Sequence, residues 1–117
     1  AVIFRFDHAE YVTFLPKSVT TAIGVGVSAE LGGYEDITTA SIIITGVLGN
    51  LFAPLICRLA RITEPIAKGV AIGSSSHAMG TARAMEMGET EGAMSGLSIA
   101  VAGLLTVVGA TVFSKLI

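Results

Sequence analysis

The chain has 117 residues, of which 52% are hydrophobic and only 14% are charged, whereas about 25% of the residues in an ordinary soluble domain are charged. A soluble domain of this size needs more polar residues to cover its surface, so the composition favours a membrane protein. The formal net charge of -2, with seven scattered Lys and Arg residues, argues against a nucleic-acid partner, and the single cysteine, Cys57, excludes an internal disulfide. No catalytic constellation is recognisable, so we expect no enzymatic activity, no metal and no other cofactor.

The first uncharged run in chain order, 18–29, is rich in Gly, Ser and Thr and is too short to span a bilayer as a helix. At about 1.5 Å per residue it covers roughly 20 Å, whereas the hydrocarbon core is about 30 Å thick. We therefore expect the segment 17–32 to be broken or re-entrant. The next run, 37–57, contains 21 uncharged residues and predicts a continuous transmembrane helix.

The same order of a short and a long run then occurs a second time. The short polar run 69–82 predicts a second broken or re-entrant segment over 66–87, and the 22 residues of 93–114 predict a second continuous transmembrane helix. Several residues recur at a constant offset of 56, for example Thr20 and Ser76, which indicates an internal repeat unless the matches arise by chance. Paired short, Gly-interrupted segments are typical of the binding site of a transporter.

The basic residues predict how these segments are oriented in the membrane. Arg58, Arg61 and Lys68 follow the first long run and Lys115 follows the second, so the positive-inside rule puts the C-termini of both spans in the cytoplasm. Each short segment then crosses the membrane as well, which gives four crossings. A re-entrant hairpin, which would return both ends of a short segment to one side, is the alternative.

Small residues at spacing four predict the faces on which the long helices pack. One stripe in the first span includes Gly49 and Ala53, and another in the second span includes Gly92, Gly96 and Ala100. Small residues let neighbouring helices approach closely in lipid. We therefore expect both stripes to be helix contacts.

The stretch 71–86 carries three serines, a histidine and an arginine in an apolar run. Polar groups in the bilayer are costly and usually face a cavity or a partner. On a helix, Gly69, Gly73, His77 and Thr81 share one face, and the two glycines would let another backbone or a ligand come close to the imidazole. A carboxylate ligand could then accept a hydrogen bond from His77. In the alternative interpretation, a neighbouring helix carbonyl binds His77 and the hydroxyls bond back to their own helices. The predicted substrate site consists of Thr20, Thr21, Ser75, Ser76 and His77.

Three stretches, LPKSVTTAIG (15–24), IITGVLGNLFAP (43–54) and GSSSHAMGTARAMEMGETEGAMSGL (73–97), closely resemble the C-terminal half of the LrgB/CidB family of bacterial membrane proteins. The family often has Pro after the two threonines, where this chain has Ala22. The resemblance implies an all-α, multi-pass protein of the bacterial inner membrane. It also implies that 1–117 is one membrane domain, the C-terminal half of a longer protein.

The resemblance implies two functions. Our first hypothesis is the transport of small monocarboxylates such as pyruvate or glycolate, because the paired short segments and the polar residues favour it. The alternative is antiholin-like or holin-like regulation of murein hydrolase activity and cell lysis. The expected partners are the bilayer, a small carboxylate substrate and a small LrgA/CidA-type membrane protein, and a homo-oligomer is an open alternative.

Overall fold

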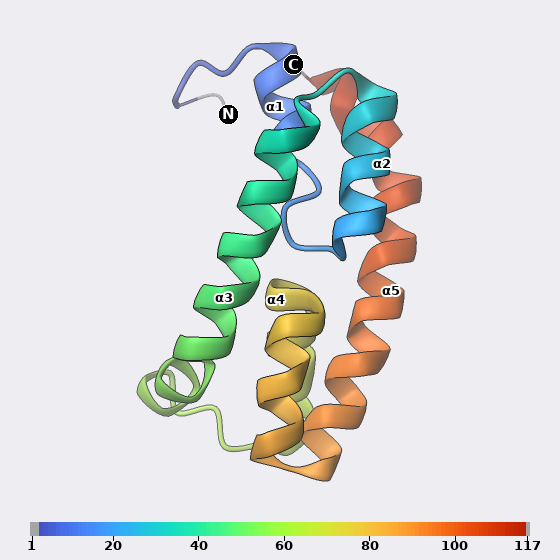
Figure 1. Cartoon of the computed structure of the whole chain (residues 1–117). Helices are drawn as coiled ribbons and strands as arrows, with labels where there is room; N and C mark the ends of the chain where they lie inside the picture. Colours follow the sequence, from blue (N-terminus) through green and yellow to red (C-terminus); the bar gives the residue numbers. More distant parts are fainter. Residues whose placement is uncertain (1–2, 117) are drawn as a thin grey trace.

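The computed structural model describes residues 3–116, and within that range the chain is entirely helical, without a strand (Figure 1). The all-α fold expected from the sequence is therefore confirmed. The helices are α1 (His8–Phe14), α2 (Thr21–Leu31), α3 (Glu35–Leu59), α4 (Pro65–Met87), α5 (Glu89–Phe113) and the 3-10 turn η1 (Ser114–Leu116).

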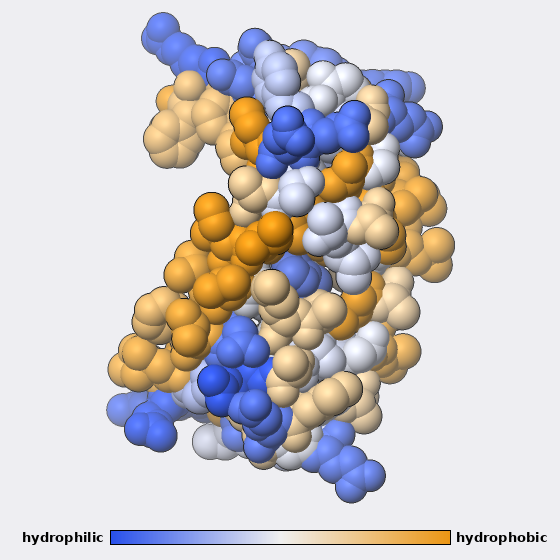
Figure 2. Space-filling view, in the orientation of Figure 1, coloured by the Kyte–Doolittle hydropathy of each residue, from blue (hydrophilic) through white to orange (hydrophobic). Residues whose placement is uncertain are grey.

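Two of these helices, α3 and α5 together with η1, are long and apolar enough to cross a membrane. They contain the runs 37–57 and 93–114, for which continuous helices were expected. Much of their apolar surface is exposed, and Figure 2 shows a hydrophobic band along the α3 side of the molecule, with hydrophilic residues gathered toward the two ends. Such a surface is costly in water and suits contact with lipid or with other membrane helices.

The helices α3 and α5 run in opposite directions (Figure 1). Gly33, just before α3, packs against Thr13 of α1, and α1 also contacts η1 at the end of α5. The start of α3 and the end of α5 therefore lie at the same end of the molecule. The expectation that both C-termini lie on one side of the membrane is wrong, because it was drawn from only a few basic residues and assumed that the segment between the two helices crosses.

That segment, α4, folds back on itself. His77 has non-helical backbone angles, φ 44° and ψ -141°, and divides α4 into two half-helices. In a straight helix Gly80 and Ile72 would be roughly 12 Å apart along the axis. Here a Cβ added at Gly80 would lie only 3.0 Å from Cγ2 of Ile72, and Lys68 and Met87 border the same cavity. The four-crossing arrangement is therefore wrong for 66–87, and the re-entrant alternative describes it.

A similar in-and-out path precedes α3. After α1 the chain turns through 15–19, toward the middle of the molecule, and α2 returns to the end where α1 lies (Figure 1). The segment 17–32 is thus a turn followed by one regular helix. The two short segments enter from opposite ends, and α3 and α5 have 25 residues each. An inverted repeat would give this arrangement, although the repeat itself stays a prediction.

Buried hydroxyls join α1, α2 and α3 at one end of the molecule. Thr13, Ser28 and Thr38 are at most 1% exposed. Oγ1 of Thr38 lies 2.7 Å from Oγ of Ser28 and 2.9 Å from the carbonyl oxygen of Thr13, and the backbone N–H of Tyr34 donates to Oγ1 of Thr13 over 2.8 Å. Because a buried polar group is costly without a partner, these bonds fix the relative positions of the three helices.

Candidate functional site

The three serines at the tip of the α4 hairpin bond mainly to their own half-helix. Oγ of Ser74 donates to the carbonyl of Val70, and Oγ of Ser75 to that of Ala71, both over 2.7 Å. Ser76 is buried, and its Oγ lies 3.1 Å from Oγ of Ser75. Side chains of Ser that bond four residues back commonly relax and bend a helix, which fits their position just before the break.

His77 is buried at the tip and is held by α3. Its Nε2 lies 2.9 Å from the carbonyl oxygen of Ile42, and since a carbonyl only accepts, Nε2 is the donor. Gly46 lets the His77 ring approach α3 closely, because a Cβ added at Gly46 would lie only 2.6 Å from Cε1 of His77. This hydrogen bond is the one foreseen in the alternative, structural interpretation of His77. The positive φ is uncommon for a residue with a side chain, and such strain is found where surrounding contacts enforce it.

The returning half of α4 is bound to both long helices. Oγ1 of Thr81 donates to the carbonyl of His77 and lies 2.7 Å from Oγ of Ser95 in α5. Nδ2 of Asn50 in α3 donates to the carbonyl of Met79 over 2.8 Å, and Nε of Arg83 donates to the carbonyl of Asn50 over 3.0 Å. The sequence interpretation missed Asn50, although a lone amide inside an apolar span is a signal that could have identified it.

The glycines of the predicted His77 face do not open a space for a ligand. A Cβ at Gly73 would collide with the carbonyl oxygen of Ser95 in α5, and one at Gly69 would lie 2.7 Å from Cβ of Met94. These two glycines therefore admit α5, while His77 faces α3. The two glycines therefore do not share one face with His77, because α4 is not a continuous helix through residue 77, and another backbone rather than a ligand lies against them.

The two threonines of the predicted site lie at the start of α2. Thr20 is the N-cap residue but makes no side-chain capping bond, and Thr21 is exposed. Within residues 3–116 no hydrogen bond joins either threonine to Ser75, Ser76 or His77. Both short segments nevertheless pack on Ile42: its carbonyl accepts from His77, and its side chain meets Gly24 of α2. The five predicted residues thus form two groups around one turn of α3.

The small residues at spacing four lie at a helix contact in α3 but only partly so in α5. Gly49 of α3 is in direct contact with Ser76, so a Cβ at this position would collide with that side chain. In α5, Gly92 packs on Met85, but Gly96 has no atom within 4 Å of an added Cβ. The second stripe is therefore only partly a helix contact, because the face of α5 that packs on α4 runs through Ser95 rather than Gly96.

The side chains that commonly ligate metals do not cluster in the part of the chain that the structure describes. Among residues 3–116, no group of three or more His, Cys, Asp or Glu side chains is placed to hold a metal ion. The groups available at the hairpin tip are hydroxyls, backbone groups and one imidazole, which act by hydrogen bonding.

Two antiparallel helices long and apolar enough to cross a membrane, with a polar helical hairpin between them, define an all-helical fold suited to a membrane. Comparison with known proteins assigns the family: the chain belongs to the LrgB-like family, whose model matches residues 1–116.

Curated relatives share 37–39% sequence identity with the chain. The antiholin-like protein LrgB of Bacillus subtilis is 39% identical over 97% of this chain and 49% of its own length. The holin-like protein CidB of Staphylococcus aureus is 39% identical over 88% of this chain and 45% of its own length. The uncharacterized protein YxaC of Bacillus subtilis is 37% identical over 90% of this chain and 46% of its own length. The chain thus spans about half the length of these relatives, and no solved structure matches it.

Proposed function

We propose that the protein containing this chain is a holin-like or antiholin-like protein of the bacterial cytoplasmic membrane that regulates murein hydrolase activity and cell lysis. The observation that carries this proposal is the family match over residues 1–116, together with relatives named antiholin-like LrgB and holin-like CidB. A small LrgA/CidA-type membrane protein is the proposed partner. This function replaces monocarboxylate transport as the better supported of the two hypotheses.

The structure offers a surface for such a partner. The outer face of α3 exposes a row of large apolar side chains, including Ile44, Leu48, Leu51 and Leu55, and none of them belongs to the buried apolar cluster that α3 shares with α4. In lipid, helices associate through close packing and interhelical hydrogen bonds rather than through the hydrophobic effect. A small membrane protein could therefore pack on α3 without disturbing the hairpin.

The experiment uses the full-length protein in a host strain from which its gene has been deleted. Complementation should restore the wild-type extracellular murein hydrolase activity, measured by zymography, and the wild-type rate of lysis. Gly49→Leu, which would collide with Ser76, should fail to complement, whereas Gly96→Leu should complement. Deletion without any effect on hydrolase activity or lysis would contradict the proposal.

Transport of small monocarboxylates is a second candidate, favoured by one observation. The polar tip of the α4 hairpin ends inside the span, about two turns into α3 at Ile42, and the turn before α2 approaches from the opposite end. Paired broken segments of this kind surround the substrate in many transporters. The accessible hydroxyls would be those of Thr20, Thr21 and Ser75, with Ser76 and His77 supporting them from the interior.

This second candidate is tested by uptake of labelled pyruvate, glycolate and lactate into proteoliposomes containing the full-length protein. Thr21→Val removes an exposed hydroxyl and should lower uptake by at least several-fold while leaving thermal stability unchanged. Thr39→Val, a matched change whose hydroxyl bonds only within α3, should leave uptake unchanged. Uptake no faster than in empty liposomes would eliminate transport of these substrates.

A further inference from the structure

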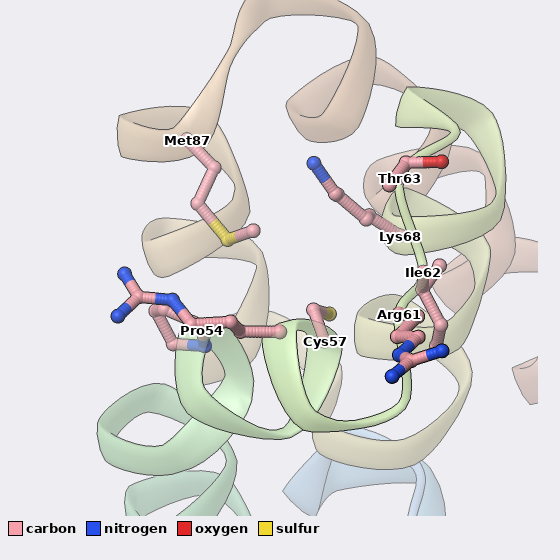
Figure 3. Close-up of a pocket in the computed structure, with 8 residues that line it drawn as sticks. Pro54, Cys57, Arg61, Ile62, Thr63, Lys68 and Met87 are labelled. Carbon is pink, nitrogen blue, oxygen red and sulfur yellow. The ribbon is translucent and has the colours of Figure 1, made fainter.

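A cavity of about 570 Å³ lies where α3 ends and both ends of the α4 hairpin meet (Figure 3). Figure 3 shows Lys68 and Met87 extending toward the same space from opposite sides, with Thr63 and Arg61 of the connecting loop along its border. The hairpin creates this cavity, because only a segment that returns to its own side brings Lys68 beside Met87.

The polar part of the lining is entirely cationic or neutral. Arg58, Arg61 and Lys68 border the cavity, and its lining includes no carboxylate. In the part of the chain that the structure describes, none of these three cations forms a salt bridge. The neighbouring carboxylate of Glu64 caps α4 by accepting from the N–H of Ile66. Three unpaired cations around one cavity favour an anionic ligand.

The position of the cavity and the apolar part of its lining indicate which kind of anion it binds. The cavity lies at the end of a helix of membrane length, which is the depth of the lipid headgroups. Pro54 and the buried Cys57 form apolar lining, and Leu55 and Leu59 continue an exposed apolar surface along α3. A ligand that combines a phosphate with acyl chains would satisfy both parts, whereas a small soluble anion would leave the apolar surface unused.

We propose that this cavity binds the phosphate headgroup of an anionic phospholipid. Arg58, Arg61 and Lys68 contact the phosphate, the Thr63 hydroxyl donates a hydrogen bond to it, and an acyl chain lies along α3. Basic pockets between membrane helices on the cytoplasmic side bind anionic headgroups in this way. Neither of the two candidate functions requires or includes this site.

The test is native mass spectrometry of the full-length protein purified with phosphatidylglycerol. Each Lys or Arg near an anionic surface contributes about five-fold in affinity, so the double variant Arg61→Gln/Lys68→Gln should retain the lipid roughly 25-fold more weakly. Lys115→Gln, which removes one charge at the opposite end of α5 and is matched to the single variant Arg58→Gln, should retain it like the wild type. Equal retention by all three proteins would overturn the proposal.

Two further arms separate the sources of the anion and guard against misfolding. Phosphatidylcholine should be retained at least ten-fold less than phosphatidylglycerol, and millimolar glycerol 3-phosphate should not displace the bound lipid. Displacement by glycerol 3-phosphate would overturn the lipid assignment in favour of a soluble phosphate. If the double variant aggregates on size-exclusion chromatography, Arg58→Gln alone carries the test, with about five-fold weaker retention expected and unchanged retention contradicting the proposal.

Discussion

The two short segments differ in how their innermost residues are held. In α4, Ser76 and His77 at the tip are buried, and the imidazole of His77 is bound by α3 while Thr81 is bound by α5. In the segment before α3, the buried hydroxyl network lies at the outer end, around Thr38, and Thr21 at the inner end is exposed. A polar residue deep in the molecule can thus be structural, and the residues left available to a ligand are those without such bonds.

The largest expected effect is at the contact between α4 and α5. Gly73→Leu would drive a side chain into the backbone of Ser95, which cannot move without displacing α5. Overpacking of a close contact typically costs about 1–3 kcal/mol, and a backbone collision should reach or exceed the upper value. The measurement is the folded yield and the thermal stability of the full-length protein in detergent.

Gly96→Leu serves as the matched control for this prediction, since an added Cβ there has no neighbour within 4 Å. It should fold and melt like the wild type. Folding and melting of Gly73→Leu like those of Gly96→Leu would contradict the close approach of α4 and α5.

A smaller effect is expected at the hairpin tip. His77→Ala removes the hydrogen bond to Ile42 and should destabilise the protein by about 1–2 kcal/mol, the upper range for a side-chain hydrogen bond between membrane helices. His77→Gly removes the same bond but tolerates the positive φ, so it should melt at a higher temperature than His77→Ala. The order of the two melting temperatures is the measurement, and an Ala variant more stable than the Gly variant would contradict the backbone break at this residue.

The smallest effect is expected in the hydroxyl network at the outer end. Thr38→Val keeps the shape of the side chain but removes its bonds to Thr13 and Ser28, at a cost of about 0.6 kcal/mol for each bond, the average for hydrogen bonds between membrane helices. Thr39→Val should cost less, because its hydroxyl only bonds back to Glu35. A double-mutant cycle of Thr38→Val with Ser28→Ala should show an interaction energy between the two hydroxyls. Strictly additive effects would contradict the hydrogen bond between them.

The sequence predicted the helical content and both long helices, because uninterrupted apolar runs such as 37–57 are a strong local signal. The short uncharged run 69–82 also indicated that 66–87 is not a regular continuous span. It did not predict the direction of α5, which depends on the break at His77, and a break at a histidine has no local signature comparable to Gly or Pro. The few basic residues are too scattered along the chain to indicate the direction of α5.

The candidate site was predicted in the same way, by residue type rather than by contact. Ser74, Ser75 and His77 were recognised as unusual polar residues, but whether each bonds to its own helix, to α3 or to a ligand depends on tertiary structure. Asn50 and Ser95 were missed because their partners come from distant parts of the chain. The spacing of Gly69 and Gly73 correctly indicated close approach, and α5 rather than a ligand occupies that space.

The central structural claim is that α4 returns to the side of the membrane from which it enters. Single cysteines at Arg61 and Glu89, introduced separately into the full-length protein with Cys57 replaced by Ser, would flank the hairpin, and one at Asp36 would mark the opposite end. An impermeant thiol reagent applied to oriented vesicles should label Arg61→Cys and Glu89→Cys from the same face and Asp36→Cys from the other. Labelling of Arg61→Cys and Glu89→Cys from opposite faces would show that α4 crosses the membrane and would contradict the account.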